Sequence, residues 1–425
     1  MQQKKMALVP RLRFPEFREA GEWIAPTLGE ISVPVEERVG DRRLIPVSIS
    51  AGLGFVPQTE KFGRDISGSQ YRLYTVVRDG DFVYNKGNSL RFPQGCIYDL
   101  QGWGEVAAPN VFICFRLKDG YESAFFRQCF ERNVHGIQLR KHITSGARSN
   151  GLLNISRETF FSVRIPTPDF DERQRIAGCL SSLDDLISAE NQKLEALKAQ
   201  RLGLIQRIFP QEGEALPRMR FPEFEGMDSW EPKTVEQLAD FTSGGTPSKA
   251  NPEFWNGEIP WASAKDMKPL FLDDTEDHIT AIAARNGAKL LPAGTILVLT
   301  RGMTLLKDVP ISILTRPMSF NQDVKALQVK DGVCSNFVAY LLLSCKRRLL
   351  DLVDIAGHGT GRLDTDKFKA LEVMLPEENE QKRIADFLLS YEGVITHQGQ
   401  KVEALKKHKL GMAQQLFPVM GESNT

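Results

Sequence analysis

The chain has 425 residues and carries 54 Lys and Arg against 54 Asp and Glu, so its formal net charge is zero. Apolar residues make up 41% and charged residues 25%, values typical of a protein that buries cores, and the length predicts two or three domains. The charge balance excludes a uniformly basic nucleic-acid coat and a polyanionic tail, but it leaves room for a local basic face. Six cysteines without a C-x-x-C pair argue against a disulfide framework or zinc ribbon. No apolar run approaches the ~20 residues of a membrane span, so we expect a soluble, cytoplasmic protein.

The most informative feature is an internal repeat. Short motifs recur at offsets of 218 − 11 = 207, 379 − 171 = 208 and 403 − 195 = 208 residues. The pairs are RLRFPEF (11–17) with RMRFPEF (218–224), DERQRIA (171–177) with NEQKRIA (379–385), EALK (195–198) with EALK (403–406), and Phe209-Pro210 with Phe417-Pro418. The stretches 36–145 and 233–355 share almost nothing by eye. This pattern predicts two modules of one kind, each with a variable body framed by repeated edges.

The segment from Asp171 to Phe209 has no proline and only two glycines, and its apolar residues follow a heptad spacing that the second copy repeats. The pattern favours a two-helix coiled coil over an ordinary core helix. Its predicted seam and partner-interface residues are Leu180, Leu183, Ile187, Leu194, Leu197, Leu388, Tyr391, Ile395, Val402 and Leu405. Polar residues interrupt the seam at Glu190, Arg201, Gln398 and Lys409. They could fix the register of the helices or mark the docking of further partner helices.

The variable bodies are expected to be α+β. Short segments rich in β-branched and aromatic residues, bounded by turn residues, predict strands. They are 71–86, 111–117, 294–300 and 324–329, with helices expected at Ser123 to Glu131 and Asn336 to Leu350. Each body has about 130 residues, enough for a core of its own.

Motifs for catalysis are missing from the sequence. There is no G-x-x-x-x-G-K-[ST] phosphate loop, no H-E-x-x-H and no G-x-S-x-G. The six histidines never combine with Cys or carboxylates at metal-ligand spacing. Asn251-Pro252-Glu253-Phe254 only superficially resembles the base-binding loop of amino-methyltransferases. An enzymatic site on this chain is therefore not expected.

Features for binding are better supported. Residues 36–164 carry 18 Lys and Arg against 13 Asp and Glu, a difference of +5, whereas residues 233–371 carry 17 against 16, a difference of +1. Loops that combine cations with Gly, Ser and Asn can donate to phosphates or base edges, although a solvated turn is an equally good interpretation of any one of them. The candidates are Arg140, Lys141, Arg148 and Asn150 in the first body, and Thr246, Ser248 and Lys249 in the loop 242–249 of the second. Trp255 and Trp261 are either core anchors or recognition residues.

Several segments together resemble the specificity subunits of type I restriction–modification systems. In the second half they are 243–267, the G-x-G-R-L turn at 359–363 and the helix-opening EQKRIA; in the first half they are 44–58, 74–86 and DERQRIA. The resemblance spans essentially the whole chain. It implies two α/β target-recognition domains separated by two long antiparallel coiled-coil helices, with an internal pseudo-two-fold repeat. The implied boundaries are 1–168 and 211–376 for the two domains, and 169–210 and 377–418 for the two spacer helices.

The resemblance also implies a function. Such a subunit is not an enzyme: it reads a bipartite, asymmetric sequence in double-stranded DNA and scaffolds two modification (methyltransferase) and two restriction (endonuclease) subunits. S-adenosylmethionine, ATP and Mg²⁺ would be used by those partners, with no cofactor or metal on this chain and no membrane contact. Arg362, in the G-x-G-R-L turn, joins the candidate DNA contacts. The alternatives are an endonuclease or methyltransferase that acts alone, and a coiled-coil scaffold that binds only proteins.

Overall fold

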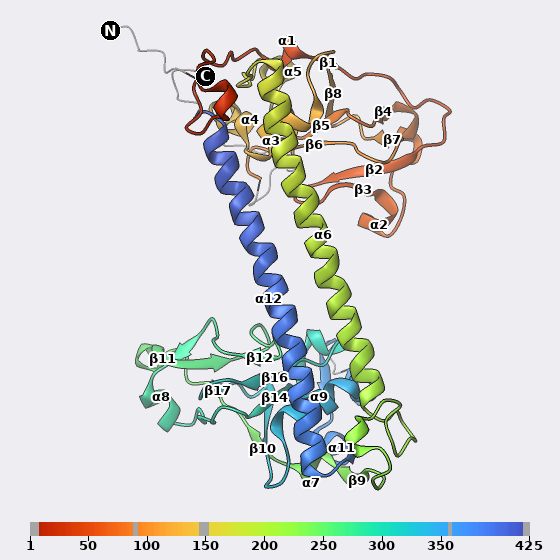
Figure 1. Ribbon diagram of the computed structural model, residues 1–425, viewed down its shortest axis with the longest axis vertical. Coiled ribbons are helices and arrows are strands. Elements are labelled where there is room, and N and C mark those ends of the chain that lie inside the picture. The colour runs from red at the N-terminus through yellow and green to blue at the C-terminus, as the bar shows by residue number, and fades with distance from the viewer. Residues whose placement is uncertain (1–7, 88–91, 144–152, 356–358, 420–425) are drawn as a thin grey trace. The chain divides into compact units, whose positions relative to one another are not determined.

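The computed structural model describes residues 8–87, 92–143, 153–355 and 359–419 (Figure 1). The chain divides into two compact units: unit 1 comprises residues 1–191 and 400–425, and unit 2 comprises residues 192–399. Both units mix helices and strands. Among the described residues, no helix is both long and apolar enough to span a membrane.

Unit 1 contains two four-stranded sheets, with strand orders β1-β8-β5-β6 and β3-β2-β7-β4. The strands are β1 (Ser32–Pro34), β2 (Ile45–Ser50), β3 (Gly54–Pro57), β4 (Thr75–Arg78), β5 (Phe82–Asn85), β6 (Cys96–Asp99), β7 (Glu105–Ala108) and β8 (Ile113–Leu117). The short helices are α1 (Leu28–Ile31), α2 (Gln58–Phe62), α3 (Ser123–Glu131), α4 (Val134–Leu139) and α5 (Arg157–Phe161). The predicted helix over Ser123 to Glu131 is therefore confirmed at both ends.

Unit 2 is built around a five-stranded sheet with the order β10-β18-β14-β16-β12. Smaller sheets have the orders β13-β11-β17, β15-β20-β19 and β21-β9. The strands are β9 (Glu231–Thr234), β10 (Ala239–Ser243), β11 (Trp255–Ala262), β12 (Phe271–Leu272), β13 (His278–Ile279), β14 (Ile296–Leu299), β15 (Arg301–Gly302), β16 (Ile311–Leu314), β17 (Ser319–Phe320), β18 (Val324–Val329), β19 (Val353–Ile355), β20 (Gly361–Leu363) and β21 (Glu372–Leu375). The short helices are α7 (Val235–Leu238), α8 (Ala281–Arg285), α9 (Ser335–Ser344), α10 (Lys346–Asp351) and α11 (Thr365–Lys369).

The two bodies share one topology although their sequences do not match. In unit 1, β8 pairs antiparallel with β1 and β5, and β5 pairs antiparallel with β6. In unit 2, β18 pairs in the same way with β10 and β14, and β14 pairs with β16. Each body also has one parallel pair outside this sheet, β2 with β7 and β11 with β17. The repeat thus extends through the parts of the chain where sequence comparison shows almost nothing.

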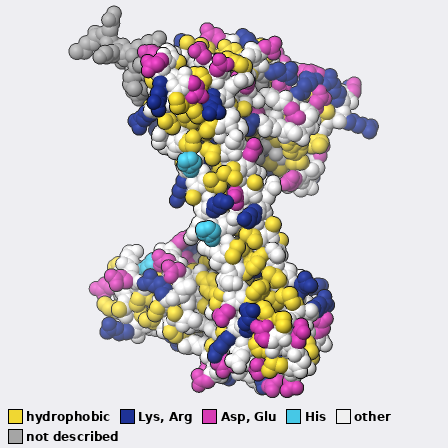
Figure 2. All heavy atoms as spheres, viewed as in Figure 1, with side chains coloured by type: hydrophobic (Ala, Val, Ile, Leu, Met, Phe, Trp, Pro, Cys, Tyr) yellow, Lys and Arg dark blue, Asp and Glu magenta, His cyan; other side chains and the backbone are white. Residues whose placement is uncertain are grey.

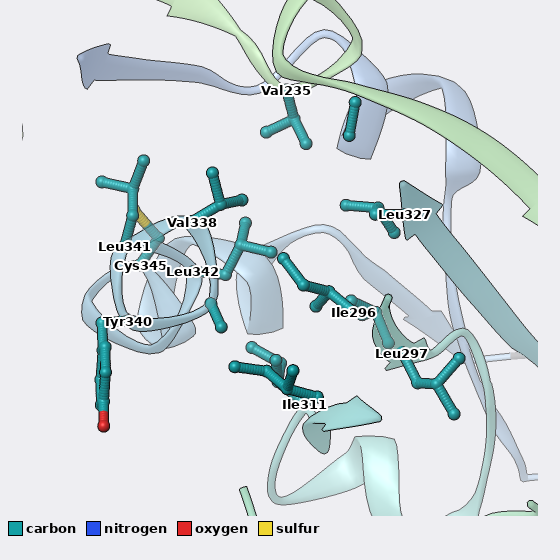
Figure 3. Close-up of a cluster of buried hydrophobic side chains, with 14 of the residues drawn as sticks. Val235, Ile296, Leu297, Ile311, Leu327, Val338, Tyr340, Leu341, Leu342 and Cys345 are labelled. Atoms are coloured by element: carbon teal, nitrogen blue, oxygen red, sulfur yellow. The ribbon is translucent and has the colours of Figure 1, made fainter. Parts of the chain in front are cut away.

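The core of unit 2 forms where α9 covers the five-stranded sheet. Figure 3 shows side chains of α9, among them Val338 and Leu342, facing Ile296 of β14 and Ile311 of β16. All four of these side chains are buried, which removes apolar surface from water at about 25 cal/mol per Å². The predicted helix over Asn336 to Leu350 is wrong in one respect. It is broken at Cys345, whose backbone (φ −88°, ψ 7°) caps both α9 and α10.

The repeated RxRFPEF and helix-opening motifs contact each other in both units. The guanidinium of Arg13 donates two hydrogen bonds of 2.7 Å to the carboxylate of Glu172, and Arg220 donates two of 2.8 Å to Glu380. The remaining donors of each arginine bind backbone carbonyls just before the repeated tryptophan. Both carboxylates are only 1–2% exposed. These bidentate clasps tie the start of each long helix to its own unit.

The other end of each long helix is held by the repeated Phe-Pro motif. Phe417, which follows α12, packs against Trp23 at 5.9 Å between ring centroids and against Phe125 at 5.2 Å. Phe209, which follows α6, packs against Trp230 at 6.3 Å. All five of these aromatic side chains are buried. Each unit thus clasps the start of one long helix and buries the aromatic end of the other.

The two long helices are α6 (Phe170–Ile208) and α12 (Glu378–Leu416), each of 39 residues, which confirms the helices that the heptad pattern predicts. In unit 1 they run antiparallel, since Asp184 contacts Lys409 at 2.7 Å while Glu190 contacts Lys401. In unit 2, Arg201 pairs with Glu392 at 2.6 Å. Three of the four polar seam positions therefore form ion pairs between the helices, as expected of residues that fix a register.

The predicted seam residues differ in burial. Four are buried: Leu180, Leu388, Ile395 and Val402. Six are half-buried: Leu183, Ile187, Leu194, Leu197, Tyr391 and Leu405. A strict two-helix seam buries its knobs only on the side that faces the other helix. The half-buried positions leave apolar surface for a further contact, and the role of all ten as a partner interface stays a prediction.

Candidate nucleic-acid interface

One end of the five-stranded sheet of unit 2 brings together several loops that the sequence analysis selected. Ser243 at the end of β10 lies opposite Lys325 near the start of β18, and Leu299 at the end of β14 lies opposite Val324. The loops that follow β10 and β14 and the turn that precedes β18 therefore meet at the same end of the sheet. We call this region the open end of unit 2.

The loop after β10 can reach this position only because it contains two glycines. A Cβ atom at Gly244 would lie 2.3 Å from the carbonyl oxygens of Phe320 and Asn321, and one at Gly245 would lie 2.8 Å from a third carbonyl. The N–H of Gly245 also donates to the carbonyl of Phe320 at 2.9 Å. The close approach of the two backbones explains the Gly-Gly pair of the Ser-Gly-Gly-Thr-Pro segment.

Thr246, Ser248 and Lys249 are all exposed in this loop. The hydroxyl of Thr246 donates to the side-chain carbonyl of Gln322 in the turn before β18. No hydrogen bond or ion pair joins the ammonium of Lys249 to the part of the chain that the structure describes. The loop thus presents a hydroxyl-rich edge and one cation to solvent.

Trp255 and Trp261 of unit 2 support the backbone of this loop. The indole N–H of Trp261 donates to the carbonyl of Gly245 at 3.0 Å, and that of Trp255 donates to the carbonyl of Ser248 at 3.1 Å. Their rings meet edge to face with centroids 5.3 Å apart. Trp261 is buried and belongs to a small apolar cluster. Of the two interpretations left open by the sequence, the structure favours anchors.

Arg362 reaches the same open end from a distant part of the chain. It lies in β20, directly opposite Arg301 of β15 on one side and Asp354 of β19 on the other. Both arginines are exposed. The backbone N–H groups of Thr300 and Arg301 donate to the carbonyl of Asp323, in the turn that also holds the Thr246 contact. Thr246 and Arg362, 116 residues apart, are therefore joined through a short series of contacts.

Sequence reasoning missed Arg301, Gln322 and Lys325. A signal for Arg301 was present, because it directly follows the apolar strand segment 294–300. The remaining candidates belong to unit 1. Arg140 and Lys141 are exposed in a short 3-10 helix, Arg140–His142, after α4. Arg148 and Asn150 lie outside the described residues.

The corresponding sheet end of unit 1 carries a different set of groups. Lys86 directly follows β5, as Thr300 directly follows β14. The carbonyl of Lys86 accepts a hydrogen bond from the N–H of Leu153 at 2.8 Å, and the carbonyl of Thr300 accepts one from the N–H of Leu363 at 2.9 Å. Nearby, Arg157 of α5 forms an ion pair with Glu36 after β1. This end is thus partly neutralised by the protein itself.

A tight hairpin between β2 and β3 projects an apolar tip from unit 1. Leu53 is 78% exposed and lies between Gly52 (φ +87°) and Gly54 (φ +79°), conformations that favour glycine. The hydroxyl of Tyr98 accepts from the N–H of Gly52 at 2.7 Å, which holds the turn against the sheet. The leucine is therefore presented on a supported backbone.

Acidic and basic side chains are interspersed over the visible surface of each unit rather than gathered on one basic face (Figure 2). Among the described residues, no cluster of three or more His, Cys, Asp or Glu could hold a metal ion, and all six cysteines are free thiols. Burial raises the pKa of Cys96 to about 11 and that of Cys114 to about 12, the opposite of what a reactive thiolate requires.

Comparison with known proteins gives the relationship. Residues 227–407 match the model of the "Type I restriction modification DNA specificity domain". This part of the chain is therefore similar to the DNA specificity domain of type I restriction–modification systems. The matched segment covers most of unit 2, the half of the chain that contains the open end.

Two relatives are specificity subunits of named enzymes. The EcoR124I/EcoR124II specificity subunit of Escherichia coli is 34% identical over 166 residues, which are 39% of this chain and 41% of the relative. The MjaIX specificity subunit of Methanocaldococcus jannaschii is 29% identical over 193 residues, 44% of each chain. The matched segments thus span less than half the length of these relatives. The crystal structure of a type I restriction–modification S subunit from M. genitalium has 14% identity, a TM-score of 0.59 and coverage of 97% of this chain and 100% of its own. That likeness shows the fold, and it supports the α+β class with two units and long helices.

Proposed function

We propose that this chain is the non-catalytic DNA-recognition subunit of a type I restriction–modification complex. Each unit would read one half of a bipartite target in double-stranded DNA. The observation that carries this proposal is that the chain uses one sheet topology twice. The motifs that hold the long helices are the same in both units, whereas the exposed side chains at the corresponding end of each main sheet differ. Two equivalent bodies with different exposed side chains are suited to two unlike half-sites. Such a complex would work in the cytoplasm.

The chemistry would belong to the partners. Modification subunits would bind S-adenosylmethionine and methylate adenine, and restriction subunits would use ATP and Mg²⁺. Much of the phosphate neutralisation would also come from the partners, which fits a chain whose own net charge is zero. We expect two modification and two restriction subunits for one copy of this chain.

The surface of the long helices supports two copies of one partner. Large apolar side chains are exposed at positions that repeat with the 208-residue offset: Leu186 (42%) with Val394 (51%), and Leu202 (55%) with Leu410 (57%). Ordinary surface helices carry polar residues on the face that points to water. The matched positions would give each copy of a modification subunit the same apolar contact.

Methylation mapping tests the proposed function directly. DNA from cells that express this chain with its cognate modification subunit would be sequenced by a single-molecule method, against cells without this chain. We expect adenine methylation in both halves of one bipartite motif, only when the chain is present. A purified complex of the two proteins that methylates no motif would instead favour a scaffold that contacts proteins alone.

The partner contact has a matched control on the same helices. We expect the double substitution Leu202→Ser and Leu410→Ser to weaken complex formation with the modification subunit at least tenfold, as measured by analytical ultracentrifugation. Gln206→Ser with Gln414→Ser changes two exposed residues that are also 208 positions apart, and it should leave assembly unchanged. Equal assembly of both double variants would show that these leucines are not the contact.

A further inference from the structure

Two exposed arginines occupy directly opposite positions of an antiparallel strand pair in unit 2. Arg301 of β15 faces Arg362 of β20, and Asp354 of β19 lies on the other side of Arg362. Opposite residues in such a pair have Cβ atoms about 4.5–5.5 Å apart and project from the same face, and like charges placed this way are destabilising. Neither guanidinium forms a hydrogen bond or an ion pair with the residues that the structure describes. Asp354 has its own recorded partner, the ammonium of Lys367 at 3.8 Å.

The backbone around the two arginines is fixed by packing. A Cβ atom at Gly361 would lie 2.7 Å from the Cβ of Leu305 and 3.1 Å from a methyl of Val353, so the strand can pass there only with glycine. Leu363, on the same face as Gly361, is buried. Because successive residues of a strand point to opposite faces, Arg362 is directed outward. On the partner strand, the N–H of Arg301 donates to the carbonyl of Asp323 at 3.2 Å.

Two carboxylates lie near Arg362, those of Asp354 on β19 and of Asp364, and the other neighbouring groups at the open end are donors. The ammonium of Lys325 donates to the hydroxyl of Ser243. The exposed Thr246 and Lys249 lie in the loop that follows Ser243 in the sequence. Two adjacent guanidiniums that form no ion pair with the described residues, beside a hydroxyl-rich loop, can bind an anion from outside the chain. One arginine alone could read a guanine, but two at this spacing match the two non-bridging oxygens of one phosphodiester.

We propose that Arg301 and Arg362 clamp a single phosphate of the DNA backbone and thereby set the register of unit 2 on its half-site. This inference rests on the proposed function. Phosphate contacts position a protein on DNA without carrying sequence information. Base selection would then fall to the adjacent loop that contains Thr246 and Ser248. The clamp gives unit 2 a fixed point from which that loop reaches the bases.

The test uses the full chain in complex with its modification subunit and a duplex that carries the mapped target. Affinity would be measured by fluorescence anisotropy over a range of salt for wild type, Arg301→Gln, Arg362→Gln and the double variant. We expect each single variant to bind about threefold to tenfold more weakly. The slope of log K against log salt should fall by about 0.9 in the double variant, the value for one phosphate. Preference among target sequences should be unchanged.

A control at the opposite end of the same sheet isolates the effect. Arg316 is exposed and follows β16, whereas Arg301 follows β14, which runs antiparallel to it. Arg316→Gln removes the same charge from the same unit and should change neither affinity nor slope. Because removing one of two like charges relieves repulsion, the unfolding midpoint of Arg362→Gln should equal or exceed that of wild type. A clear drop would assign Arg362 a structural role and overturn the clamp.

Neutral phosphate analogues locate the contact on the DNA. Methylphosphonate would be placed at one backbone position at a time, and we expect one position at which wild type binds no better than the double variant. Relaxed selectivity at a single base pair in Arg301→Gln or Arg362→Gln would mean base reading and would contradict the clamp. Unchanged affinity in the double variant, with wild type still selective for the target, would overturn the clamp alone. Wild type without any sequence preference would overturn the proposed function as well.

Discussion

The two units have the same sheet topology, but they differ in whether the arginines at the corresponding end of the main sheet form ion pairs. In unit 1, Arg157 is paired with Glu36. In unit 2, Arg301 and Arg362 lie side by side and form no ion pair with the described residues. The counts of charged residues point the other way, since the first body has an excess of +5 and the second of only +1. Net charge therefore does not locate the cations that can meet DNA, because pairing within the fold removes many of them.

The frames of the two units differ much less than their surfaces. Each clasp joins an arginine of the RxRFPEF motif to the glutamate that opens a long helix, with the same hydrogen bonds. A second contact repeats with it, from Arg175 to Glu16 in unit 1 and from Arg383 to Glu223 in unit 2. The repeated sequence motifs thus form the same contacts at the start of each long helix, whereas the exposed side chains of the two bodies do not take part in these contacts and can differ.

Breaking a clasp should have the largest effect, and an equal one in both units. Arg13→Met and Arg220→Met each leave a buried carboxylate without its partner, which costs about 3–5 kcal/mol. Hydrogen exchange followed by mass spectrometry should show the loss in unit 1 for the first variant and in unit 2 for the second. Replacing both partners, as in Arg220→Met with Glu380→Leu, should restore much of the stability. A large loss in only one unit would contradict the equivalence of the two frames.

Acid should separate the units, because among the described residues only unit 1 buries a histidine in its core. His135 lies against the rings of Tyr84 and Phe130 at 5.9 and 6.0 Å, and burial, partly offset by the backbone of Gly95, lowers its pKa to about 4. The unfolded chain, with a histidine pKa of about 6.5, takes up the proton first as the pH falls. The stabilisation of the neutral form is therefore complete above about pH 6.5 and declines toward pH 4, by about 3 kcal/mol.

The measurement is unfolding of the full chain by urea at several pH values, with exchange rates read separately in each unit. His135→Leu should remove this part of the pH dependence. No described histidine of unit 2 is buried, so this unit should not weaken for this reason. Equal acid sensitivity of unit 1 with and without His135 would show that carboxylates dominate instead.

Much of the fold followed from local pattern. The heptad spacing predicts α6 and α12, and the β-branched segment 324–329 is β18 to the residue, because periodicity and propensity decide such elements locally. The break at Cys345 was not predictable, since the apolar pattern continues across it. Directly after the break, the ammonium of Lys346 pairs with Asp308, 38 residues earlier in the chain.

The candidate interface was only partly predictable for the same reason. Composition singles out the loop with Thr246 and Lys249, because Gly, Ser and Thr beside a cation form a local signal. The neighbour of Arg362 is Arg301, 61 residues earlier, and strand register alone brings them together. The common topology of the two bodies was hidden too, since many different apolar sequences can fill one arrangement of strands.

We expect the smallest effect on stability from a substitution in the hairpin between β2 and β3 of unit 1, where the two units also differ. In unit 2 the chain after β11 closes on itself through Ser263, whose N–H and hydroxyl both lie 2.9 Å from the carboxylate of Asp266. In unit 1 the chain after β2 presents Leu53 to solvent instead. Leu53→Ser should change the free energy of unfolding by less than about 0.5 kcal/mol, because little burial is lost.

If unit 1 reads its half-site through this hairpin, the same variant should weaken binding to the mapped target, because an exposed leucine can contact a thymine methyl group or wedge between base steps. Ser263→Ala in unit 2 is the contrasting change, and it should cost stability through its lost hydrogen bond rather than affinity. Methylation mapping of the Leu53→Ser complex should show altered selection in one half of the motif only. Altered selection in both halves would mean that the hairpin acts on the whole complex and not on the recognition of unit 1.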